Sequence, residues 1–246
     1  MPTSRGPSLD PNTRLGVRMV LIVIALILVA VPFGLLLLEV IFKGPLVGLD
    51  QRIAIRQNLH DLRDPARVTW ARLVSLLGST PVLIGVVIVA CLYLAVLHRR
   101  RRQALFLVTT SVLGLIVNNI IKVIVSRSRP QFDHAVAHAF GKSFPSGHAM
   151  NSTVVYGSLL VIAWGPLRTT VRRTAAAVLV GALIAAIATS RVVLGVHYAS
   201  DVVAGIVLGA ALVLASAAAF NAWQHEGGRL PAAVENAPTV PRGRPN

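Results

Sequence analysis

The chain has 246 residues, of which 54% are hydrophobic and 13% are charged, and its formal net charge is +15. Charged residues make up about a quarter of an ordinary soluble domain, so this composition excludes a purely soluble protein. Nucleic acid is excluded as the partner of the positive charge, because the basic residues flank apolar runs and aromatic residues are too few for base stacking. Anionic lipid head groups are the expected partner instead.

Six uncharged stretches are long enough, or nearly long enough, to cross a bilayer as helices. They are residues 19–38, 73–97, 103–121, 149–167, 174–190 and 202–223. They lack the alternation of apolar and polar residues that barrel strands show. The first stretch has too long an apolar core for a cleaved signal peptide, so it is predicted to be a retained span. The predicted fold is therefore all-α, a six-helix transmembrane bundle.

We expect one domain at residues 17–223, flanked by disordered cytoplasmic tails at 1–16 and 224–246 that lack an apolar period. Residues 44–72 place leucines near helical spacing with arginines between them, which predicts a short interfacial helix or, alternatively, a plain loop. Gly205 and Gly209 form a GxxxG pattern, and Gly181 repeats its small-residue spacing in the stretch before. Such residues allow close helix packing, although glycine is also simply common in membrane helices.

The arginine run at 99–102, between the second and third stretches, favours a topology with both termini in the cytoplasm. In that topology thirteen of the 24 lysines and arginines lie on the cytoplasmic side. The three motifs described next all fall on the outer side. This agreement suggests that they form one site.

Three cations lie at or just beyond the outer ends of two predicted spans. Lys122 follows the third stretch, Arg129 comes next in the pattern Lys-x6-Arg-Pro, and Arg191 follows the fifth stretch. Ionisable groups this close to hydrocarbon are costly, so they are functional candidates. Arginine contacts phosphate with a planar fork and lysine with a point charge, which predicts a phosphate-binding role for all three. For each one taken alone, snorkelling to the interface is the alternative.

The sequence Pro145-Ser146-Gly147-His148 predicts the start of the fourth helix. Ser146 is a suitable N-cap, and Gly147 lets a ligand approach the backbone closely. The free N–H groups and the helix dipole favour an anion there, so both residues are predicted to bind phosphate. A simple capped helix would not need His148, which is therefore a predicted catalytic residue.

His197 and Asp201 are four residues apart and would share one face of a helix. An aspartate that accepts a hydrogen bond from one ring nitrogen leaves the other nitrogen free to attack. We predict that His197 attacks phosphorus and forms a phosphohistidine. His148 would protonate the leaving oxygen and then accept a proton from water. Because fixed cations and backbone amides would stabilise the developing charge, neither a metal nor another cofactor is expected.

Together these motifs resemble the tripartite signature of the type 2 phosphatidic acid phosphatase superfamily. The resemblance covers roughly residues 45–215 and includes Gly78-Ser79, near the start of the second stretch. It implies a six-helix membrane protein with its site on the outer-leaflet side, a nucleophile at His197 and a general acid at His148. It also implies phosphate contacts from Lys122, Arg129, Ser146, Gly147, His148 and Arg191.

The expected function is hydrolysis of lipid phosphates or polyprenyl diphosphates; phosphatidic acid, phosphatidylglycerol phosphate and undecaprenyl diphosphate are the candidate substrates. The expected location is the bacterial inner membrane, with the site facing the extracytoplasmic side. A lipid phosphotransferase is one alternative, because it shares the first chemical step. A non-catalytic lipid-phosphate binder or transporter is another, although it would not need two histidines and an aspartate. The sequence does not determine the oligomeric state.

Overall fold

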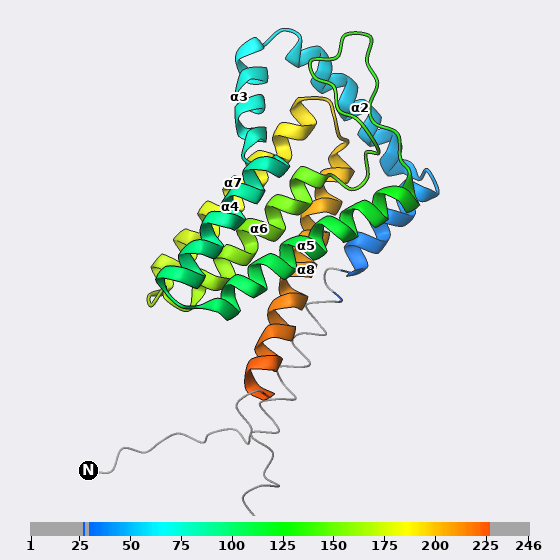
Figure 1. Ribbon diagram of the computed structural model, residues 1–246. Helices are drawn as coiled ribbons and strands as arrows, with labels where there is room; N and C mark the ends of the chain where they lie inside the picture. Colours follow the sequence, from blue (N-terminus) through cyan, green and yellow to red (C-terminus); the bar gives the residue numbers. More distant parts are fainter. Residues whose placement is uncertain (1–26, 28–29, 227–246) are drawn as a thin grey trace, which may run out of the picture.

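The computed structural model describes residue 27 and residues 30–226, and this part of the chain is a bundle of helices (Figure 1). A first helix, Ala30–Ile41, precedes α2. The helices that follow are α2 (Pro45–Asp61), α3 (Pro65–Leu76), α4 (Thr80–Leu92), the π-helical turn η1 (Tyr93–Leu97), α5 (Arg101–Val125), α6 (Gly147–Trp164), α7 (Thr170–Val193) and α8 (Ala199–Glu226). The predicted all-α class is confirmed. Most of the expected tails lies outside the described residues, and α8 continues to Glu226.

Four helical segments of the described chain are long and apolar enough to cross a membrane. They are Thr80–Leu97, Arg101–Val125, Thr170–Val193 and Ala199–Phe220. The helices Ala30–Ile41 and Pro45–Asp61 would make a fifth span if taken together, although the chain bends by 82° between them. The predicted count of six spans therefore remains a prediction.

The fourth predicted span forms α6, but its composition differs from that of the other spans. Its first turns carry His148, Asn151 and Ser152, and Ser152 is fully buried. α6 lies between α5, α7 and α8, and it contacts α4 as well. A helix enclosed by other helices can carry polar residues that lipid would not tolerate. α6 is thus the central helix of the bundle.

The contact between α6 and α8 depends on two glycines. A Cβ atom at Gly205 would lie 2.8 Å from the carbonyl oxygen of Ser146, and one at Gly209 would lie 2.8 Å from that of Met150. The predicted GxxxG pattern therefore does bring two backbones together. Gly181, in contrast, has no atom of the described residues within 4 Å of its Cβ position, so the small-residue pattern in α7 makes no such contact with them.

The predicted second span began too early. Residues 73–76 end α3, and α4 begins only at Thr80, with a proline in its first turn. Proline favours the start of a helix, which explains the boundary. A Cβ at Gly78, in the turn between the two helices, would clash with Ile187 and touch His148 at 3.4 Å. The turn therefore needs glycine because Ile187 of α7 packs against it, and His148 lies within ordinary contact distance of the same position.

The segment after the first helix forms two helices, α2 and α3, rather than a loop, and both lie at one end of the bundle (Figure 1). The buried residues of α2 are Asp50, Ala54, Asn58 and Asp61. Its leucines at 49 and 59 are exposed, as is Leu62 just after the helix. A segment packed on a membrane bundle can turn its polar face inward and its apolar face toward lipid. The expected helix is present as α2, with its polar side facing the protein, and a second helix, α3, follows it. Its position at the membrane interface remains a prediction.

Candidate functional site

The three sequence motifs meet at one end of the bundle. The C-terminal ends of α5 and α7 and the N-terminal ends of α6 and α8 lie together there, below the loop of residues 126–146 (Figure 1). The backbone N–H of Ser146 donates to the carbonyl oxygen of Asp201 at 3.0 Å, which joins the second motif to the third. The turn between η1 and α5, with its arginine run, lies at the opposite end (Figure 1).

His197 lies in the turn between α7 and α8 and is only 2% exposed. Its Nε2 atom lies 3.0 Å from Nη1 of Arg129, and its Nδ1 atom lies 3.4 Å from Oδ2 of Asp201. A guanidinium can only donate, so Nε2 must accept and the proton of the neutral ring is on Nδ1. The unprotonated nitrogen therefore faces a cation.

Burial lowers the pKa of His197 to about 4, although the hydrogen bond and the charge of Asp201 act in the opposite direction. The positive charges of Arg129 and Lys122 lower this pKa further. The imidazole is consequently neutral at physiological pH. A neutral imidazole with a free Nε2 is the form that can act as a nucleophile.

Ser143 holds the carboxylate of Asp201 in place but was missed in the sequence analysis. Its hydroxyl donates a short hydrogen bond to Oδ2 of Asp201 and lies 3.5 Å from Nδ1 of His197. The backbone N–H of Tyr198 donates to the same carboxylate oxygen at 3.0 Å. Ser143 stands two residues before Pro145, and this proximity to the second motif was the only available signal.

A glycine determines the path of the chain from Arg191 to His197. α7 ends at Val193, and Gly195 has φ +67°, a left-handed conformation that favours glycine. A Cβ at this position would lie 3.1 Å from the ring of Phe132, in the loop of residues 126–146. The turn thus brings His197 under that loop, next to Arg129.

Arg129 is held by backbone oxygens from two segments. It donates to the carbonyl oxygens of Phe140 and Gly141, each at 3.1 Å, and to that of Val196 at 2.6 Å. These bonds fix the guanidinium over Nε2 of His197. An anion that binds to His197 would therefore meet Arg129 directly.

The other two predicted cations also lie at this end. Nζ of Lys122 donates to the carbonyl oxygen of Lys142 at 2.9 Å, and Nη1 of Arg191 donates to the hydroxyl of Ser75. The buried Nε of Arg191 has no hydrogen-bond partner among the described residues. Both side chains therefore keep donors for an anion.

The N-terminus of α6 differs in one respect from the prediction. Ser146 is the N-cap residue, but its side chain makes no capping hydrogen bond. Its buried hydroxyl has no partner in the described part of the chain. Gly147 lies beside Lys122, because its Cβ position is 4.0 Å from Cε of that lysine. The hydroxyl and the first-turn amides thus remain available to a ligand.

His148 follows in the same turn and lies close enough to interact electrostatically with His197 and with all three predicted phosphate-binding cations, Lys122, Arg129 and Arg191. The structure therefore brings every predicted site residue into one cluster. No group of three or more His, Cys, Asp or Glu side chains that could hold a metal was found among the described residues.

Two further residues behind Asp201 were missed in the sequence analysis. Arg127 forms an ion pair with Asp201 and a second one with Asp50 of α2. Arg127 lies between the two positions of the Lys-x6-Arg pattern, and nothing in its spacing distinguished it. Asp50 is a single acid among leucines, which gave no signal of its partners in α8 and the loop.

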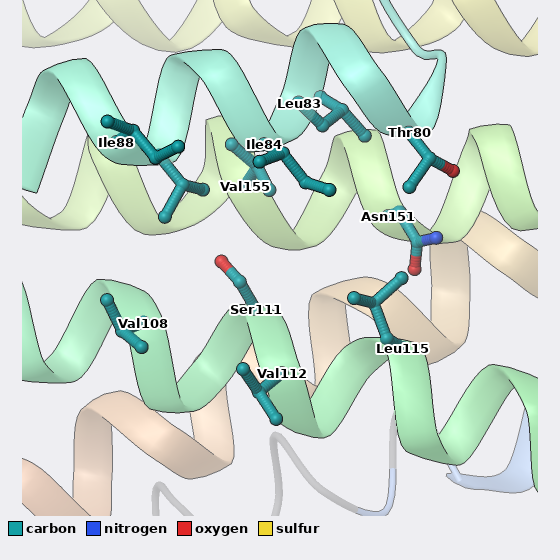
Figure 2. Close-up of a pocket in the computed structure, with 11 residues that line it drawn as sticks. Thr80, Leu83, Ile84, Ile88, Val108, Ser111, Val112, Leu115, Asn151 and Val155 are labelled. Carbon is teal, nitrogen blue, oxygen red and sulfur yellow. The ribbon is translucent and has the colours of Figure 1, made fainter.

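An apolar groove opens beside the site, between α4 and α5, with α6 at its base. Figure 2 shows Ile84 and Ile88 of α4 facing Val108 and Val112 of α5 across it. The groove reaches Asn151, three residues after His148. Its polar lining is small, and most of its surface is aliphatic.

Comparison with known proteins identifies the family. The family model described as PAP2 superfamily matches residues 103–225. The chain is 34% identical over 163 residues to decaprenylphosphoryl-5-phosphoribose phosphatase of Mycobacterium tuberculosis, which covers 64% of this chain and 82% of that protein. The chain belongs to the PAP2 superfamily, and the resemblance noted in the sequence is confirmed.

Two Bacillus subtilis comparisons agree with this assignment. The chain is 35% identical over 98 residues to phosphatidylglycerophosphatase B, and this match spans 38% of the chain and 46% of the relative. The crystal structure of a transmembrane PAP2 type phosphatidylglycerolphosphate phosphatase superposes with a TM-score of 0.73 at 22% identity, over 83% of this chain and 98% of that one. This second likeness shows a shared membrane-embedded fold.

Proposed function

We propose that the chain is an integral membrane phosphatase that hydrolyses lipid phosphates through a phosphohistidine, without a metal. One observation carries the proposal: Nε2 of His197 lies 3.0 Å from the guanidinium of Arg129, which can only donate, while Asp201 faces Nδ1. A nucleophile that faces a fixed cation is suited to an anionic electrophile.

In the first step the phosphate group would displace the direct contact between Arg129 and His197. Its oxygens would be held by the guanidinium groups of Arg129 and Arg191, by Lys122, and by the hydroxyl and amides at the start of α6. Nε2 of His197 attacks phosphorus, the bond from phosphorus to the lipid oxygen breaks, and protonated His148 gives its proton to that oxygen.

In the second step water attacks the phosphorus of the phosphohistidine. His148, now neutral, accepts a proton from the water, the P–N bond breaks, and inorganic phosphate leaves. The fixed cations would stabilise the charge on the equatorial oxygens in both steps, which is usually the largest contribution to such catalysis. This is the chemical basis of the proposed metal independence.

The apolar groove between α4 and α5 supports a lipid as the substrate (Figure 2). It is lined by aliphatic side chains and leads to within one turn of His148, so an acyl or prenyl chain could lie there with its phosphate in the site. The names of the relatives also include a glycerolipid phosphatase and a polyprenyl-linked sugar phosphatase. We therefore propose glycerolipid phosphates and polyprenyl phosphates or diphosphates as the substrate class.

We propose that the protein lies in the bacterial inner membrane with the site on the extracytoplasmic side. The arginine-rich turn before α5 is at the end of the bundle opposite the site (Figure 1). Basic residues in short loops favour the cytoplasmic side. Labelling of single cysteines placed at 134 and 100 in intact cells would test this orientation, and labelling of position 100 alone would contradict it.

The proposed activity can be tested by measuring phosphate release from phosphatidic acid, phosphatidylglycerol phosphate and undecaprenyl diphosphate in detergent with excess chelator. Turnover should persist with the chelator and be inhibited by vanadate. His197→Ala should lower it at least about 1,000-fold. Full activity of that variant would refute the phosphohistidine mechanism, and loss of activity on chelation would refute metal independence.

A further inference from the structure

The carboxylate that faces His197 is bound on both of its oxygens. Oδ2 of Asp201 faces His197 and accepts from Ser143 and Tyr198, whereas Oδ1 accepts from Nη1 of Arg127 at 2.6 Å. The side chain of Arg127 is 9% exposed and that of Asp201 is 0% exposed. Salt screens such a buried pair much less than a surface pair.

The other arm of Arg127 connects the site to α2. Nη2 donates to Oδ2 of Asp50 at 2.8 Å, and Nη1 also donates to the hydroxyl of Ser200 at 2.8 Å. The guanidinium lies over the ring of Tyr198, 4.1 Å from its centroid. The planar fork is thus held in one orientation by two carboxylates and an aromatic face.

Asp50 in turn binds the first turn of α8. Its Oδ1 atom accepts from the backbone N–H of Ser200 at 3.1 Å, and its Oδ2 atom accepts from the Ser200 hydroxyl. Amides in the first turn of a helix have no partner within the helix, and a carboxylate is stabilised there by the dipole. Asp50 therefore caps the helix that carries Asp201, although it lies 150 residues away in the chain.

This arrangement restricts the rotation of the Asp201 carboxylate. Ser143 and Tyr198 both donate to Oδ2, so alone they would not fix the direction of Oδ1. Arg127 binds Oδ1 and cannot turn without losing Asp50. The oxygen presented to Nδ1 of His197 is consequently set by a residue of α2, outside the signature motifs.

We propose that Arg127 and Asp50 are positioning residues for the nucleophile: they orient the carboxylate of Asp201, keep the proton of His197 on Nδ1, and leave Nε2 directed at the phosphate. Neither residue contacts the reacting atoms. The kinetic part of this proposal rests on the proposed phosphatase function, whereas the effect on the imidazole does not.

Two conservative variants test the proposal by kinetics. Arg127→Lys keeps the charge but replaces the fork with one ammonium, and Asp50→Asn keeps the size but removes a charge. For each we expect kcat on a lipid phosphate to fall at least about tenfold, because the nucleophile is misaligned. KM and the inhibition constant for inorganic phosphate should change by less than about twofold, since Lys122, Arg129 and Arg191 are untouched.

Arg67→Lys is the matched control. Arg67 also bridges two helices by a fork, donating to Asp61 at 2.8 Å and to Gln57 at 2.7 Å, and it makes no hydrogen bond to the site. The kcat of Arg67→Lys should stay within about twofold of the wild-type value. Thermal unfolding and size-exclusion profiles give the folded fraction of each variant. Unchanged kcat per folded molecule in Arg127→Lys and Asp50→Asn would overturn the proposal.

A measurement that needs no turnover separates this inference from the proposed function. In protein carrying ¹⁵N-histidine, the resonances missing from the His197→Ala spectrum report the tautomer of His197. Wild type should show a protonated Nδ1, and Arg127→Lys should show a mixture of both tautomers. An unchanged tautomer in that variant would overturn the positioning role. If the wild type released no phosphate, the proposed function would fail while this test still decided the inference.

Discussion

The two ends of the bundle both carry arginines but hold them differently. At the site end, Arg127 and Arg129 are mostly buried and donate to carboxylate and carbonyl oxygens of distant segments. At the opposite end, Arg99 and Arg100 are exposed in a turn where Arg99 has φ +54°. A basic residue near a membrane boundary therefore indicates a binding site only when the fold buries it and gives it fixed partners. Exposed arginines can instead act only by setting the orientation of the protein in the membrane.

The contrast between buried and exposed basic residues applies to the histidines as well, and there it should give the largest change in kcat. His148→Ala should lower kcat about 100- to 10,000-fold, because the leaving oxygen would lose its proton donor. His134→Ala is the control, since His134 is an exposed loop residue at the same end of the molecule. Steady-state phosphate release measures both. Equal losses in the two variants would mean that burial in the cluster does not distinguish the catalytic histidine.

The second effect compares the arginines directly. Arg191→Ala should raise the inhibition constant for inorganic phosphate about 10- to 100-fold, because a buried donor facing the anion is removed. Arg100→Ala, at the other end of the bundle, should leave this constant within about twofold. Competition assays with a lipid phosphate give both values. A similar loss in Arg100→Ala would show that net charge, rather than a fixed position, attracts phosphate.

The pH dependence tests the environment of His197. Its pKa is lowered to about 4, so the imidazole of the proposed nucleophile is neutral above that pH and becomes protonated below it. We expect kcat/KM to fall about tenfold per pH unit below pH 4, because the protonated ring cannot attack. Asp201 acts to raise this pKa, so its replacement in Asp201→Asn should lower the pKa further. The acid limb of the residual activity should therefore move to a lower pH. Recovery of activity at pH 7 is the control for unfolding, and an acid limb above pH 6 would contradict the assignment.

The smallest effect concerns stability. Gly209→Ala should destabilise the protein by about 1–3 kcal/mol, because its Cβ would lie 2.8 Å from the carbonyl oxygen of Met150. Gly181→Ala should be neutral or stabilising, since its Cβ would meet nothing within 4 Å. Unfolding midpoints in one detergent compare the two. Equal destabilisation would contradict the close contact between α6 and α8.

The sequence predicted those parts of the site whose spacing reflects local geometry. These residues each lie at or next to a helix end, and the ends meet because consecutive helices of the bundle run in opposite directions. They are Lys122, Ser146, His148, Arg191, His197 and Asp201. Arg127 and Asp50 were not predicted, since each is a single charged residue whose partner lies more than 70 positions away. No local pattern contains that information.

The outer helices were predicted only in part, for a reason specific to membranes. The leucines of residues 44–72 indicated an amphipathic helix, but α2 buries Asp50, Asn58 and Asp61 instead. In water the apolar side of such a helix would be covered, whereas in lipid it can remain outside. The fourth predicted span was inferred from its length, but α6 is not one of the described segments that are apolar enough to cross a membrane. Its polar first turns are explained by the helices that enclose it, which only the structure shows.

The turn at Gly195 gives a physical meaning to the interval between Arg191 and His197. α7 stops at Val193, a left-handed residue reverses the chain, and the ring of Phe132 closes the space above it. An extra residue in this interval would rotate the imidazole out of register with its aspartate, and a missing one would draw it back into the helix. The number of residues between Arg191 and His197 matches the length of this one turn. Natural variants of this protein should therefore tolerate changes of residue type there far better than changes of length.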